Sequence, residues 1–368
     1  MLTLKWFGSS IAVCFLLLKG FAFAAELSIE HAPLSPDLVA VPQYLLGLIH
    51  SAEVQAELSF SPEQLSSWEK TLQEIDARWW PARILPAVQQ RKIVAELEVK
   101  MINELETLLG ADAVRRLHQI ELQSQSSRIL SRPEVAKFLG LDAKQNKKLA
   151  DLFGENDKLA AELSSKNGKA DPEKKEAYTT TKRSETKTAV AMLTPSQSGR
   201  LRGVFGKPFE TAKLERIYPL APKLIESGQW TNSEHPTLEL LRGKVVVVHF
   251  YAFQCHNCVA NFGHYKRWDE TLKGKSVQLI GIQTPETSAE REPEKVRSAA
   301  NKEGFQFPVL IDIESKNWAA WGNTMWPTVY VIDKKGYIRF WWQGELNWQG
   351  ATTDKTIEAV IDQLLSES

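Results

Sequence analysis

The chain has 368 residues, and its 45 basic and 45 acidic side chains give a formal net charge of zero. This length suggests about two domains, because a domain usually has roughly 100–200 residues. A neutral chain whose Lys and Arg are scattered among acids argues against a nucleic-acid-binding protein. Three cysteines are also too few for a small scaffold held together by disulfides.

Residues 1–25 have the pattern of an export signal. Lys5 supplies a positive charge, residues 11–18 are apolar, and residues 22–24 read Ala-Phe-Ala, a small-x-small cleavage site. The apolar run is too short to span a bilayer. We therefore expect an exported protein of the periplasm or cell envelope. An uncleaved signal that tethers the chain to the membrane is the alternative.

The next region, residues 26–205, is predicted to be an all-α domain. Apolar residues recur there every three or four positions, as in Leu65, Trp68, Leu72 and Ile75. The polar segment near 154–188 has little apolar periodicity and predicts either a mobile loop or a solvated helical spur. Residues 206–217 are expected to link this domain to the next one.

Three predicted helix starts in this domain share one pattern. In each, a Ser, Asp or Thr is followed three positions later by Gln, which predicts a capping box. The pairs are Ser61 with Gln64, Asp142 with Gln145, and Thr194 with Gln197. The segments resemble the LTxxQ motif of small helical chaperones of the bacterial envelope, although only 193–197 matches it outright. Plain helix capping explains the same residues.

Residues 218–368 alternate between strand and helix patterns. This alternation predicts an α/β domain with a parallel core sheet, and the turn at Gly336 adds an antiparallel hairpin. The expected strands are 244–251, 277–283, 308–312, 328–333 and 337–343. The expected helices are 256–273, 291–304, 316–322 and 354–366.

The sequence Cys255-His256-Asn257-Cys258 lies between an apolar strand pattern and a predicted helix. A cysteine at a helix N-terminus is held where backbone N–H groups favour the thiolate, which is the nucleophilic form. The third cysteine, Cys14, lies inside the export signal and is expected to leave with it. The remaining pair is thus predicted to be chemically reactive.

The C-terminal domain resembles the thioredoxin-like/redoxin superfamily, most closely its exported TlpA-like and DipZ-type branches. The matching stretches occur in the expected order at 230–233, 238–248, 255–258, 281–286, 321–323, 326–327 and 331–336. The resemblance implies a thioredoxin-like fold, with Cys255 as the attacking thiolate and Cys258 as the resolving thiol. It also implies that Pro327 is a cis-proline beside the sulfurs.

Four further residues are candidates for the site, each with a plainer alternative. His256 could stabilise the Cys255 thiolate, or it could be an exposed residue at the start of the helix. His249 could relay a proton to Cys258, or it could be a hydrogen-bonded core histidine. Trp326 and Phe253 could form an apolar rim that binds a partner peptide, or Trp326 could only pack the loop.

Other chemistry for a C-x-x-C pair is less consistent with this sequence. A zinc site needs a second Cys/His pair, which the sequence lacks. Covalent haem attachment needs His directly after the second cysteine, where Val259 stands. Peroxiredoxins resemble one another in a Pro and a Thr/Ser before their reactive cysteine, but Val248 and Ala252 occupy those positions here.

The sequence therefore predicts an exported thiol-disulfide oxidoreductase. It would exchange electrons between Cys255/Cys258 and cysteines of envelope proteins, mostly in the reducing direction, and would need an electron donor or acceptor but no metal or organic cofactor. The alternative is a binding or chaperone-like protein in which the helical domain acts and the thioredoxin-like domain is a scaffold with an inert disulfide.

Overall fold

The computed structural model describes residues 44–164, 172–214, 218–232 and 235–367. The predicted export signal, with Cys14, lies outside these residues. Within them, no helix combines the length and the apolar character needed to cross a membrane.

The contacts divide the chain into two compact units. The helical unit comprises residues 1–60 and 105–216, and the sheet unit comprises residues 61–104 and 217–368. This differs from the predicted division into 26–205 and 218–368, because residues 61–104 pack with the C-terminal part of the chain. The reason lies in long-range contacts of Trp80 and Arg83, which leave no trace in local sequence patterns.

The helical unit is built of short and medium helices around an apolar core that includes Leu122, Ile129, Leu149 and Phe153. Its elements are α1 (Tyr44–Leu48), α2 (Ala52–Glu57), α5 (Ala111–Gln125), η1 (Ser126–Ser131), α6 (Pro133–Leu139), α7 (Ala143–Ser164), α8 (Pro172–Ala191), α9 (Pro195–Phe205) and η2 (Thr211–Lys213).

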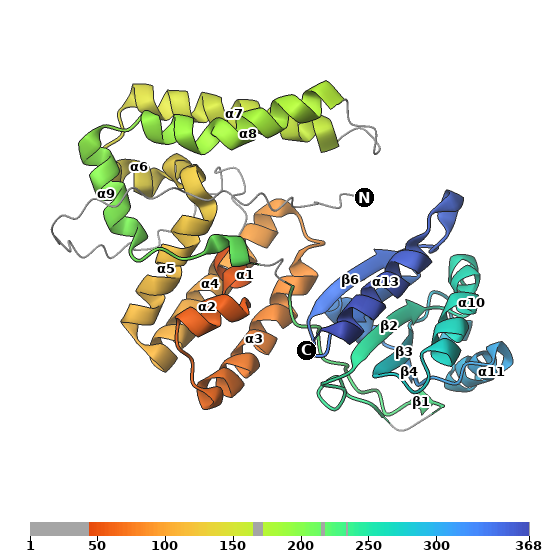
Figure 1. Ribbon diagram of the computed structural model, residues 1–368. Coiled ribbons are helices and arrows are strands. Elements are labelled where there is room, and N and C mark those ends of the chain that lie inside the picture. Colours follow the sequence, from red (N-terminus) through yellow and green to blue (C-terminus); the bar gives the residue numbers. More distant parts are fainter. Residues whose placement is uncertain (1–43, 165–171, 215–217, 233–234, 368) are drawn as a thin grey trace. The chain divides into compact units, whose positions relative to one another are not determined.

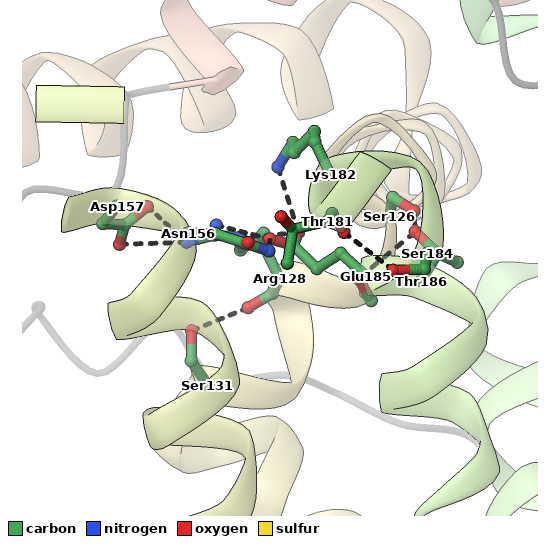
Figure 2. A network of polar contacts seen from close by, with 11 residues as sticks. Ser126, Arg128, Ser131, Asn156, Asp157, Thr181, Lys182, Ser184, Glu185 and Thr186 are labelled. Atoms are coloured by element: carbon green, nitrogen blue, oxygen red, sulfur yellow. Dashed lines mark hydrogen bonds and ion pairs between the residues drawn. The ribbon is translucent and has the colours of Figure 1, made fainter. Parts of the chain in front are cut away.

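Of the two alternatives for 154–188, the structure has the helical one. Its described residues belong to α7 and α8, which lie side by side in Figure 1. Polar contacts partly replace apolar packing between them, because the Arg128 guanidinium binds both Glu185 of α8 and Asp157 of α7 (Figure 2). An apolar periodicity search does not detect a pair of helices joined in this way.

The predicted helix caps are present. Ser61 with Gln64 and Thr194 with Gln197 form reciprocal capping boxes, and Asp142 with Gln145 makes the same two hydrogen bonds. The amide groups of Gln145 and Gln197 also bond to each other, with 2.8 Å between Nε2 and Oε1. Helix capping and this contact account for the glutamines of the two motifs.

In the described part of the sheet unit, six strands form one sheet in the order β1-β4-β3-β2-β5-β6. Strands β2, β3 and β4 are parallel, and β5 and β6 form the predicted antiparallel hairpin beside β2. The short β1 was not predicted and pairs antiparallel with β4. The strands are β1 (Trp230–Thr231), β2 (Val245–Tyr251), β3 (Val277–Gln283), β4 (Val309–Ile311), β5 (Thr328–Ile332) and β6 (Ile338–Gln343).

Helices cover both faces of this sheet, so that all seven residues of β2 are buried. Alternate residues such as Val247 and Tyr251 pack against α10 (His256–Thr271) and α13 (Thr353–Ser366). The others, such as Val248, pack with Trp80 of α3 (Pro62–Ala82) and with the region of α12 (Lys316–Ala320). The remaining elements are α4 (Ala87–Leu109), η3 (Ala289–Arg291), α11 (Pro293–Glu303) and η4 (Trp348–Gly350).

Candidate active site

The two cysteines lie at the start of α10, where the chain leaves β2. Cys255 is the N-cap of the helix, and its Sγ accepts a hydrogen bond of 3.3 Å from the backbone N–H of Cys258. Cys255 is 9% exposed, whereas Cys258 is fully buried. Both are free thiols in the structure. Cys255 is therefore the only one of the two described cysteines that keeps any exposed area.

The surroundings shift the pKa values of the two thiols in opposite directions. Hydrogen bonds from the Cys258 side chain and then from its backbone N–H lower the pKa of Cys255, against burial and the charges of Glu286 and Glu290. Burial, and next the hydrogen bond to Cys255, raise the pKa of Cys258. Cys255 therefore loses its proton more readily than Cys258.

Glu290 is a buried carboxylate beside this site that sequence reasoning missed. It is 0% exposed, and its Oε1 accepts a hydrogen bond of 2.7 Å from the backbone N–H of Gln254, directly before Cys255. Its Oε2 accepts two more from the backbone N–H groups of Glu286 and Thr287, both at 2.8 Å. Glu290 thus joins the loop after β3, through hydrogen bonds, to the residue that precedes Cys255. Several acids share this stretch of sequence, and only the fold distinguishes the buried one.

The peptide bond between Trp326 and Pro327 is cis, as expected. The Trp326 ring stacks on Trp318 with 3.9 Å between centroids, and its indole N–H donates to the Thr284 carbonyl at 3.2 Å. Trp326 and Phe253 are half-buried and pack against the apolar cluster that contains both cysteines. Trp326 thus packs its loop and still leaves part of its ring accessible.

The two histidines are placed very differently. His256 is exposed at the start of α10. His249 is fully buried, and its ring stacks on Tyr265 with 4.0 Å between centroids. Neither of its ring nitrogens has a hydrogen-bond partner among the described residues, so it differs from the hydrogen-bonded core histidine considered above. Burial lowers the pKa of His249 to about 3 and keeps the ring neutral.

Two more buried polar groups near His249 were not anticipated. Tyr251 and Gln283 are opposite each other in the register of β2 and β3. The Tyr251 hydroxyl and both amide atoms of Gln283 have no hydrogen-bond partner among the described residues. Tyrosine and glutamine also occur in ordinary strands. The sequence therefore gives no sign that these polar atoms lack partners.

Comparison with known proteins gives matches for the C-terminal part of the chain. Residues 224–341 match the model of the AhpC/TSA family. DipZ of Mycobacterium bovis is 31% identical over 151 residues, which is 40% of this chain and 21% of DipZ. The chain thus spans about a fifth of the length of DipZ.

Two smaller proteins are matched over nearly their whole length. The thiol-disulfide oxidoreductase YkuV of Bacillus subtilis is 22% identical over 147 residues, covering 40% of this chain and 95% of YkuV. A solved thiol-disulfide isomerase from Corynebacterium glutamicum is 27% identical with a TM-score of 0.32, covering 40% of this chain and 98% of that one.

Proposed function

We propose that this protein, whose C-terminal domain belongs to the thioredoxin-like/redoxin superfamily, is a thiol-disulfide oxidoreductase that reduces disulfides of partner proteins. The main support is the pair at the start of α10. Cys255 keeps 9% exposure and has a lowered pKa, whereas Cys258 is fully buried and has a raised pKa. A nucleophile and a protected resolving thiol need this division.

The exchange takes two steps. The Cys255 thiolate attacks one sulfur of the partner disulfide, forms a mixed disulfide and releases the partner's other sulfur as a thiolate. Cys258 then loses its proton and attacks Cys255 Sγ, so that the second partner sulfur leaves as a thiolate. The partner gains two electrons, and the protein ends with a Cys255–Cys258 disulfide that a separate dithiol must reduce.

The neighbouring loops supply a place for the partner's chain. We expect Pro327 and the exposed part of Trp326 to contact the segment around the partner cysteine, with Phe253 on the other side of the nucleophile. Met325 and Val259, each 46% exposed, extend this apolar surface. No metal or organic cofactor is required by these steps.

The test is the equilibrium between dithiol and disulfide in graded glutathione or dithiothreitol buffers, with Cys255→Ser as the control. A potential between about −120 and −270 mV, the range of known exchangers, is expected, and its low end would indicate a reductase. A disulfide that resists reduction well below about −300 mV would contradict the proposal. The binding-protein alternative would then be preferred.

We also propose that the protein works outside the cytoplasm, in the cell envelope, because residues 1–25 have the pattern of an export signal. Fractionation of cells that express the full chain tests this. The mature protein is expected in the periplasm with its first residues removed. Full-length protein in the cytoplasm would contradict export, and full-length protein in the membrane would indicate an anchor.

A further inference from the structure

Within the sheet unit, α3 and the residue that follows it present one face to the C-terminal part of the chain through Gln73, Asp76, Trp80 and Arg83. Their spacing of three, four and three residues places them along one side of a helix. The Gln73 amide donates to the Ala221 carbonyl at 3.0 Å, and a carboxylate oxygen of the buried Asp76 accepts from the Leu220 backbone N–H at 2.7 Å. The first half of this face is therefore hydrogen-bonded to the segment that leads into the sheet.

Trp80 continues this face into the core of the sheet unit. Its ring meets Trp341 edge-on at 5.0 Å between centroids and Tyr330 at 6.1 Å. It belongs to the same buried cluster as Val248 and Phe250 of β2. α3 thus fills the sheet face opposite α10, although it lies outside residues 224–341 that match the family.

Arg83, just after the end of α3, binds the segment that follows α12. Its guanidinium donates to the carbonyls of Trp321 and Gly322, both at 3.0 Å, and to the Tyr330 hydroxyl at 3.1 Å. It also stacks on Trp80 at 3.8 Å from the ring centroid. A guanidinium suits this place because it can donate to several fixed acceptors in one plane.

Gly322 shows how closely α3 approaches this segment. Its φ is +59°, and a Cβ at this position would lie 2.8 Å from the Cα of Pro81. A larger residue would push the two backbones apart. The contact between α3 and residues 321–322 therefore depends on glycine here as well as on Arg83.

The held segment leads directly to the active site. The Tyr330 hydroxyl, which accepts from Arg83, donates to Asn323 Oδ1 at 2.6 Å. Met325 lies two residues after Asn323 and is followed by Trp326 and the cis-proline Pro327. Arg83 thus fixes one end of the loop whose other end begins β5 at Thr328.

We propose that Arg83 is a positioning residue that holds residues 321–323, and through them the Trp326–Pro327 loop, in the arrangement needed to bind a disulfide substrate. The part about substrate rests on the proposed function, but the part about the loop does not. The redox module of this protein would then begin at α3 rather than at residue 218.

The experiment uses the full-length reduced protein with Arg83→Gln, Arg83→Lys and the matched control Arg78→Gln. Arg78 is on the same helix but forms an exposed ion pair with Glu96. Two quantities are measured: hydrogen–deuterium exchange of peptides covering 321–328, and kcat and KM for a disulfide-bonded peptide. Alkylation of Cys255 by iodoacetamide reports on the nucleophile alone.

We expect Arg83→Gln to speed amide exchange in 321–328 about tenfold or more, with β2 unchanged, and to lower kcat/KM by about tenfold to a hundredfold through KM. Cys255 alkylation stays at the wild-type rate. Arg83→Lys, which keeps the charge but not the planar fork, should give an intermediate effect, and Arg78→Gln none.

Unchanged exchange in 321–328 would overturn the proposal whatever the activity. So would faster exchange throughout the sheet unit, since Arg83 would then only stabilise the fold. If Arg83→Gln does not fold, Arg83→Lys decides by the same criteria. If the wild-type protein reduces no disulfide, the proposed function fails, while the exchange data still decide whether Arg83 positions the loop.

Discussion

Glu185 of the helical unit and His249 of the sheet unit are both buried polar side chains, but they differ in their partners. In the helical unit, the buried Glu185 receives two hydrogen bonds from Arg128, at 2.6 and 2.9 Å, and one from Asn156 at 2.6 Å (Figure 2). Burial alone would raise the pKa of Glu185, but these hydrogen bonds and that from Lys182 lower it. In the sheet unit, His249 lies buried with both ring nitrogens unpartnered among the described residues.

A buried charge with an opposite partner ties elements together, and it keeps one protonation state over a wide pH range. Buried neutral groups without partners instead cost roughly 1–3 kcal/mol each.

We expect the largest effect on stability from Glu185→Ala. It leaves the partly buried Arg128 without its main partner, so we expect the helical unit to lose about 3 kcal/mol of its free energy of unfolding. Urea unfolding followed by circular dichroism measures the loss. The rate of Cys255 alkylation should not change. A loss below about 1 kcal/mol would mean that the network is not structural.

Glu290→Gln tests whether a buried acid in the sheet unit serves the nucleophile. A glutamine presents one acceptor oxygen and an NH2 group to three backbone N–H donors. The hydrogen bonds that join residue 254 to residues 286–287 must therefore weaken. We expect iodoacetamide to alkylate Cys255 about tenfold more slowly near neutral pH, because the N-cap geometry that favours the thiolate is lost.

The matched control for Glu290 is Glu286→Gln. Glu286 is exposed, and its charge, like that of Glu290, opposes the lowered pKa of Cys255. Removing it should leave the alkylation rate of Cys255 the same or faster. If both variants react faster, Glu290 acts through its charge alone and does not position the loop.

Local patterns predicted much of the sheet unit and little of what surrounds its site. The apolar run of β2, the hairpin at Gly336 and the C-x-x-C pair are each contained within a few neighbouring residues. The placement of α3 depends on Arg83 meeting Trp321 across 238 positions of the chain, and periodicity carries no such information. The burial of Glu290 likewise depends on how two loops fold together.

His249→Phe tests the cost of the unpartnered histidine. The pKa of His249 is about 3 in the folded state and about 6.5 when unfolded, so the unfolded state binds the extra proton between these values. The stability linked to the neutral ring is present in full above about pH 6.5 and falls with the pH down to about pH 3. Relative to wild type, the free energy of unfolding of the variant should therefore rise by up to about 1.4 kcal/mol for each pH unit below about 6.5.

Urea unfolding of both proteins at about pH 7.5 and about pH 5 measures this difference. The difference between the two free energies of unfolding should be larger at the lower pH. A difference that is the same at both values would mean that His249 is protonated, or has acquired a partner, in the folded protein. The ring would then resemble the paired groups of the helical unit.

Asp157→Ala should have the smallest effect, although Asp157 bonds the same guanidinium as Glu185. Its two oxygens lie 2.9 and 3.1 Å from Arg128 Nη1, but its side chain is 62% exposed, against 3% for Glu185. Water replaces an exposed partner readily, so we expect a loss of less than about 1 kcal/mol in urea unfolding. A loss equal to that of Glu185→Ala would show that the number of partners, and not burial, decides how a charge stabilises α7 and α8.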